Sequence, residues 1–126
     1  MSSLNARCAS KAYAQTAIEI ADPRQLEASL LLQAAAKLQA VHDKWDGPAN
    51  DLSEALLYNR RLWLIFLDAV TSGDNKLPIE IRQNIANLGV FVMGETFSLM
   101  TKPKPEHLWS IIEINRALAA GLSSRR

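Results

Sequence analysis

Apolar residues recur along much of the chain at steps of three and four positions, the spacing that places them on one face of an α-helix. A first stripe of this kind lies between residues 26 and 45 and consists of Leu26, Leu30, Leu31, Leu38, Val41 and Trp45. Asp22-Pro23 stands before the stripe, with Gln25 three residues after Asp22, a sequence typical of a helix start. Gly47-Pro48 follows the stripe. The pattern predicts a helix from about residue 23 to residue 44.

The next helix is predicted to begin at Asp51, with Glu54 three residues later, and to continue to Ser72-Gly73. Its middle is an uninterrupted apolar run from Leu62 to Leu67, so the helix is apolar on every side there. A helix that is apolar all round is normally enclosed by others. We therefore expect this helix to be the central element of the fold.

Prolines mark the last two helices. Pro78 opens one after a Gly-Asp-Asn turn, and Pro105 opens the other, with Glu106 where the helix dipole favours a negative charge. The expected core face of the first is Leu77, Ile81, Ile85, Leu88 and Val92, widened by Phe91 and Met93. The expected core face of the second is Leu108, Ile111, Ile112, Leu118 and Leu122. Gly121 is expected to follow the last helical residue, as a C′ glycine.

From about residue 5 to residue 20 the chain is rich in Ala and only weakly amphipathic, with Tyr13 as its one large aromatic residue. Strand signals are nearly absent, because alternating β-branched runs do not occur and no Asn-Gly or Asp-Gly pair forms a hairpin turn between two such runs. We predict an all-α, single-domain antiparallel bundle of four long helices preceded by a short N-terminal helical segment. Its parts are the N-terminal segment 1–21, the bundle core 22–122 and the tail 123–126.

Composition narrows the functional class. In 126 residues, Lys+Arg 14 against Asp+Glu 13 give a net charge of +1, which disfavours direct nucleic-acid binding. A hydrophobic content of 48% is enough for a packed core. The longest apolar run is far shorter than the roughly 20 residues of a membrane span. The first thirteen residues lack the apolar region of a secretory signal, and Cys8 is the single cysteine, so we expect a cytoplasmic protein.

Signals for catalysis are weak. Residues 89–96 copy the spacing of a phosphate-binding loop, but Glu95 stands where the lysine would meet the phosphates. His42 and His107 lie far apart and outside any zinc-binding spacing, and no nucleophile is paired with a base. We expect no catalytic residue, no metal and no cofactor, and hence no enzyme. One alternative, an anion-binding helical enzyme, requires three arginines in one pocket: Arg60, Arg82 and Arg116.

Four asparagines interrupt the expected helix faces: Asn59, Asn84, Asn87 and Asn115. Asparagine is a mediocre helix residue, and burying its amide costs free energy unless the amide is hydrogen-bonded. The four residues indicate either a polar network between helices or a groove that accepts the backbone of a partner. Two of them sit in similar tripeptides, Tyr58-Asn59-Arg60 and Ile114-Asn115-Arg116.

Four segments in order carry a resemblance to a known family. They are Ala12-Tyr13 with residues 22–27, residues 59–66, Leu77-Pro78 with residues 81–85, and residues 114–122. Through them the chain resembles FlaF, a flagellar biosynthesis family of alphaproteobacteria, over nearly its whole length. The resemblance implies one FlaF-like helical domain over residues 1–126, without catalytic residues. It also implies a small cytoplasmic protein needed for flagellin production and export, which works alongside FlbT.

The function implied by the resemblance is flagellin binding, as a secretion chaperone for flagellar type III export and as an adaptor that couples flagellin synthesis to export. The alternative is a post-transcriptional regulator of flagellin that acts through FlbT or on flagellin mRNA. We further hypothesise that the segment around Tyr13 covers a groove between later helices and moves when flagellin binds. The candidate residues for partner binding or a structural network are Tyr13, Asn59, Arg60, Trp63, Arg82, Asn84, Asn87, Asn115 and Arg116.

Overall fold

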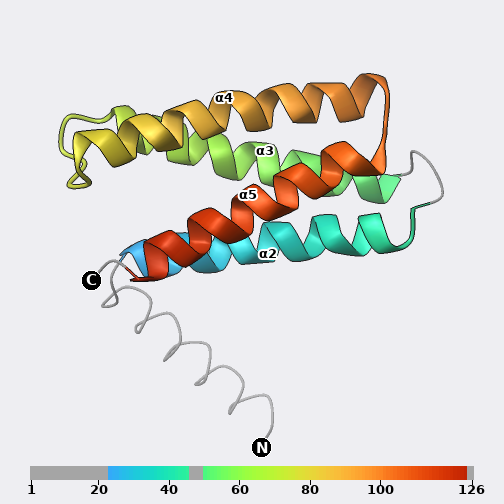
Figure 1. The fold of residues 1–126 in the computed structure, drawn as a ribbon, viewed down its shortest axis with the longest axis horizontal. Coiled ribbons are helices and arrows are strands. Elements are labelled where there is room, and N and C mark those ends of the chain that lie inside the picture. The colour runs from blue at the N-terminus through green and yellow to red at the C-terminus, as the bar shows by residue number, and fades with distance from the viewer. Residues whose placement is uncertain (1–22, 46–49, 125–126) are drawn as a thin grey trace, which may run out of the picture.

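Four antiparallel helices make up the computed structural model, which describes residues 23–45 and 50–124 (Figure 1). They are α2 (Pro23–Asp43), α3 (Asn50–Thr71), α4 (Ile79–Thr101) and α5 (Pro105–Ser124), and the described ranges contain no strand. α3 packs on α2 and α4, and α5 packs on α4 and α2, so each helix has two neighbours. The predicted all-α bundle of four long helices is confirmed. The predicted N-terminal helical segment lies outside the described residues.

Helix boundaries follow the predicted breaks, with one exception at the C-terminal end. Gly121 does not end α5, which continues through it to Ser124. The reason is Leu122, whose side chain is buried in the core and holds the next turn in place. Helix propensity disfavours a glycine by only about 1 kcal/mol, less than the burial of a leucine contributes.

Small residues bring α2 and α5 together in the most extensive helix contact of the fold. Ala28, Ala34 and Ala35 of α2 are buried, as is Ala119 of α5. Because an alanine projects only one carbon from the backbone, two helices that meet through alanines can approach closely. In Figure 1, α5 runs obliquely from the end of α4 to the N-terminal part of α2.

The expectation that α3 is enclosed on all sides is wrong. Within the apolar run, Leu62, Trp63 and Phe66 are buried, but Leu64 is 48% and Ile65 is 65% exposed. The physical reason is the arrangement of four helices, in which α3 has two neighbours and therefore one outward face. An apolar run alone does not reveal which of its sides is covered.

The predicted core face of α4 is confirmed except for Phe91: Ile85 and Val92 are buried, and Leu77, Ile81 and Leu88 pack against the core. Its buried residues are Ile85, Gly89, Val92, Thr96 and Leu99. Phe91, expected in the core, is 49% exposed, whereas Met93 is half-buried against the core. Gly89 lies directly against α3, because a Cβ atom at this position would be 2.5 Å from Leu67 Cδ2. Gly94 has open space around it, so only the first of these glycines serves a close helix approach.

Candidate functional site

Three of the predicted site residues meet in the interior of the bundle. Trp63 Nε1 donates a hydrogen bond to Asn115 Oδ1 at 3.0 Å. Asn115 Nδ2 donates to Asn59 Oδ1 at 2.7 Å and, at 3.4 Å, to the backbone oxygen of Leu31. All three side chains are fully buried. The network therefore joins α3 and α5 to each other and to α2.

The buried amides fix how the helices align along their axes. A hydrogen-bonded amide in a low-dielectric interior is satisfied only in one alignment, and any slip leaves it unpaired at a cost of roughly 1–3 kcal/mol. Asn59 Nδ2 is the one atom of the network without a partner in this structure. Since Asn59 and Asn115 are enclosed, their place in the structure favours the polar-network interpretation over direct contact with a partner.

The other two asparagines do not belong to this network. Asn84 and Asn87 are exposed on α4, and Gln83 Nε2 donates to Asn87 Oδ1 at 3.2 Å along the outer surface. The expectation that all four asparagines interrupt core faces is wrong for this pair, because the buried side of α4 runs through Ile85 and Gly89 instead. Tyr13, another candidate, lies outside the described residues.

The three candidate arginines act at separate places. Arg116 Nη2 donates to Gln39 Oε1 on α2 at 3.0 Å, and its guanidinium lies 5.9 Å from the centre of the Trp109 ring. Arg82 Nη1 donates to the backbone oxygen of Ser72 at 3.5 Å, at the α3–α4 turn. Arg60 is exposed on α3. Arg82 and Arg116 bind different parts of the bundle, so the structure does not bring the three into one anion pocket.

Both histidines make contacts that the sequence did not predict. His107 Nδ1 lies 2.7 Å from Glu95 Oε2 and links α5 to α4. His42 lies in the last turn of α2, as expected, and its ring centre is 5.3 Å from that of Trp109.

The carboxylate of Asp43, next to His42, accepts a hydrogen bond from Gln39 Nε2 at 2.7 Å. This hydrogen bond, and a second one with His42, hold the pKa of Asp43 below its ordinary value.

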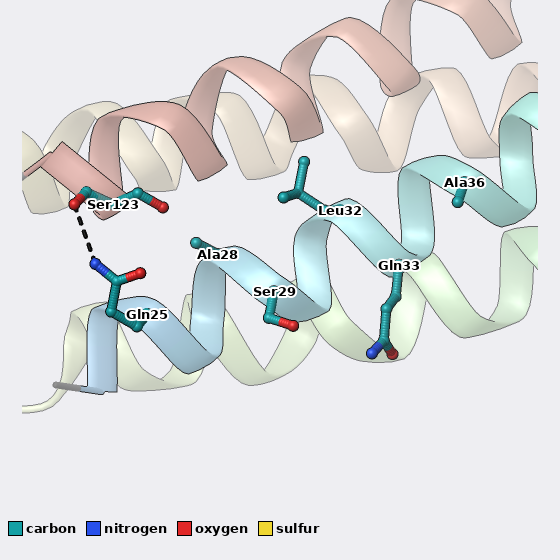
Figure 2. Close-up of a pocket in the computed structure, with 7 residues that line it drawn as sticks. All are labelled: Gln25, Ala28, Ser29, Leu32, Gln33, Ala36 and Ser123. Atoms are coloured by element: carbon teal, nitrogen blue, oxygen red, sulfur yellow. Dashed lines mark hydrogen bonds between the residues drawn. The ribbon is translucent and has the colours of Figure 1, made fainter. Parts of the chain in front are cut away.

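A shallow pocket lies on α2 beside the end of α5 (Figure 2). Its rim is fixed by Gln25 Nε2, which donates to the backbone oxygen of Ser123 at 3.1 Å. The side chain of Gln25 therefore bonds α5 at this position, and Asp22 of the expected capping box lies outside the described residues. The seven lining residues carry no titratable group: Gln25, Ala28, Ser29, Leu32, Gln33, Ala36 and Ser123. The pocket can offer contact area but no acid–base chemistry.

The most distinctive surface feature is apolar and lies on α3 and α4. On α4, Val90 is 73% exposed, and Phe97 and Met100 are each 67% exposed. On α3, Leu57 and Leu64 are exposed as well. Sequence reasoning missed this surface because it expected the apolar run of α3 to be enclosed and gave no role to Val90, Phe97 and Met100. The sequence did contain one indication of this surface: α4 carries more large apolar residues than one buried stripe can hold.

Within residues 23–45 and 50–124, His, Cys, Asp and Glu side chains nowhere gather in a group of three or more that could hold a metal ion. Over the same part of the chain, none of the helices combines the length and the apolar character needed to cross a membrane.

Comparison with known proteins identifies the family. The family described as flagellar protein FlaF matches residues 9–122, which is most of the chain. Neither the curated proteins nor the solved structures contain a match. The match includes α2, α3 and α4, α5 as far as Leu122, and the buried asparagine network between the helices. The chain belongs to the FlaF family of flagellar proteins.

Proposed function

We propose that this flagellar protein binds flagellin in the cytoplasm, serves as its secretion chaperone and couples flagellin synthesis to export. The observation that carries the proposal is the apolar surface on α3 and α4, where Leu64, Val90 and Phe97 are exposed. Large apolar side chains grouped on a surface are typical of interaction sites. A chaperone needs such a surface, because its client exposes apolar segments before it is folded.

The interior of the bundle suits the same role. The hydrogen bonds among Trp63, Asn59 and Asn115 favour a single helix alignment, so the outer apolar surface exists before any partner arrives. A preformed surface lowers the free energy spent on ordering the binder. Amphipathic segments bind such surfaces with their apolar side in a groove between helices. The termini of unexported flagellin are segments of this kind.

Calorimetric titration with flagellin from the same organism tests the proposal. We expect saturable one-to-one binding, and no heat from an unrelated unfolded protein used as the control. The absence of binding at tens of micromolar would contradict the proposal. Titrations with FlbT and with flagellin leader RNA complete the experiment, and steeply salt-dependent RNA binding would favour the regulator instead.

A further inference from the structure

α4 carries two apolar stripes, only one of which faces the core. The buried stripe includes Ile85, Val92 and Leu99. The second stripe, here called the α4 seam, consists of Ile79, Ala86, Val90, Met93, Phe97 and Met100. From Ala86 onward its members are separated by steps of four and three, the spacing by which one helix packs along another. Ile79, Val90, Phe97 and Met100 are exposed, whereas Met93 is half-buried against the core. No described part of the chain therefore covers these four side chains.

The contact between Gly89 and Leu67 shows where the seam lies. At about 100° per residue, Met93 and Met100 lie within about 40° of Gly89 around the axis of α4, and therefore beside α3. On α3, Leu64 lies one turn before Leu67. Because the two helices are antiparallel, Leu64 is opposite the part of α4 that contains Met93. The seam and the exposed leucines of α3 thus lie on the two sides of the outer line of contact between these helices. This surface is here called the outer α3–α4 groove.

Charge at this groove indicates what kind of partner fits. Arg60 lies two turns before Leu67, on the side of α3 that faces the groove, and is exposed. It makes no ion pair within the described ranges. The acidic residues of α4 are Glu80 in its first turn and Glu95, which bonds His107 on α5. A second copy of α4 would therefore bring no free carboxylate to the middle of the seam, whereas an acidic partner helix would.

From these observations we infer that the outer α3–α4 groove, with the α4 seam on one side and Leu57 and Leu64 on the other, is the docking site for an amphipathic helix. This helix is about 20 residues long and carries acidic residues along the edge facing Arg60. The length follows from the span Ile79 to Met100, at about 1.5 Å per residue. The inference rests on the proposed function, and it specifies which class of flagellin segment is bound.

The location of the docking site is tested by substituting exposed residues in the α3–α4 groove and, as a control, on α2. Leu64 in the groove and Leu32 on α2 match as a pair, since they are 48% and 49% exposed. We expect Leu64→Glu and Phe97→Glu each to weaken flagellin binding by about tenfold or more, as loss of a central apolar contact does. Leu32→Glu should bind within about twofold of the wild type. Circular dichroism checks that all three variants keep their helices.

The charge of the partner is tested at Arg60. Arg60→Glu should weaken binding by about fivefold or more at low salt and by less at high salt. Lys44→Glu makes the same change of charge at an exposed residue directly after α2 and should leave binding unchanged. Equal binding by Arg60→Glu and wild type at low salt would overturn the acidic class of the partner.

The outcomes separate this inference from the proposed function. If wild type binds flagellin and Leu64→Glu and Phe97→Glu bind equally well, the groove is wrong while the proposed function stands. If the wild-type protein does not bind flagellin, both the proposed function and the docking site are wrong. Analytical ultracentrifugation of the protein without flagellin measures whether it forms dimers. A dimer that Phe97→Glu converts to a monomer would assign the seam to self-association and overturn the inference.

Discussion

The side-chain amide of Asn115 on α5 donates a 2.7 Å hydrogen bond to Asn59 Oδ1 on α3, across 56 positions of sequence and in the centre of the bundle. The two residues occupy the tripeptides Tyr58-Asn59-Arg60 and Ile114-Asn115-Arg116. The two similar tripeptides therefore contain the two asparagines that hydrogen-bond to each other in the structure. In each of them, the asparagine is buried and the arginine that follows is exposed.

Asn115→Ala is expected to lower the free energy of unfolding by about 2–3 kcal/mol, because it leaves the Trp63 indole N–H and Asn59 Oδ1 unpaired in the interior. Urea denaturation followed by circular dichroism measures this loss. Asn84→Ala on the outer surface of α4 serves as the control and should change stability by less than about 0.5 kcal/mol. A loss of flagellin affinity without a loss of stability would contradict a structural role for Asn115.

The two glycines of α4 are expected to respond oppositely to alanine. Gly94→Ala should raise the free energy of unfolding by up to about 1 kcal/mol, because nothing obstructs the added methyl group and alanine favours the helix. Gly89→Ala should lower it by about 1–3 kcal/mol through the clash with Leu67. Thermal unfolding of both variants checks the difference. A stabilising Gly89→Ala would contradict this prediction and show that the Leu67 side chain moves aside at little cost.

The positions of the helices could be predicted from the sequence because a few neighbouring residues, such as proline and glycine, determine where each helix begins or ends. Pro78 and Pro105 mark the starts of α4 and α5, and the Gly-Pro pair at 47–48 separates the first two long helices. Helix faces were harder to assign, since a stripe with steps of three and four looks the same whether it meets the core or a partner. The two stripes of α4 show this directly.

The candidate site could be predicted only in part, for a related reason. The sequence singled out four asparagines, but their residue type does not distinguish Asn115, which is buried, from Asn84, which is exposed. The difference depends on which side of each helix faces its neighbours, and tertiary packing decides that. The link between His107 and Glu95 has the same origin, because it joins two helices across a turn.

Gln39→Ala is expected to raise the pKa of Asp43 toward its ordinary value of 3.8, because the hydrogen bond from Gln39 is the main cause of the lowered pKa. A carboxylate with a lowered pKa in the folded state stabilises the fold above the unfolded-state pKa and loses that contribution as the pH falls through the folded-state pKa. NMR titration of the side-chain carboxyl carbon measures the shift. Gln33→Ala, elsewhere on α2, should leave the pKa of Asp43 unchanged.

Residues 1–20 are expected to change their hydrogen exchange when flagellin is bound, as the hypothesis of a moving cover around Tyr13 requires. An Ala-rich segment buries little apolar area, so a competing partner could displace it at small free-energy cost. Hydrogen–deuterium exchange with saturating flagellin measures the effect. Unchanged exchange in residues 1–20 would remove the cover hypothesis and leave the α3–α4 groove unaffected.

Hydroxyl-radical footprinting with and without saturating flagellin tests the central claim most directly, because methionine and aromatic side chains report their own exposure. If flagellin binds in the outer α3–α4 groove, oxidation of Phe97 and Met100 will fall sharply, while that of Trp109 on α5 will stay the same. Unchanged oxidation of Phe97 and Met100 at saturation would contradict the account.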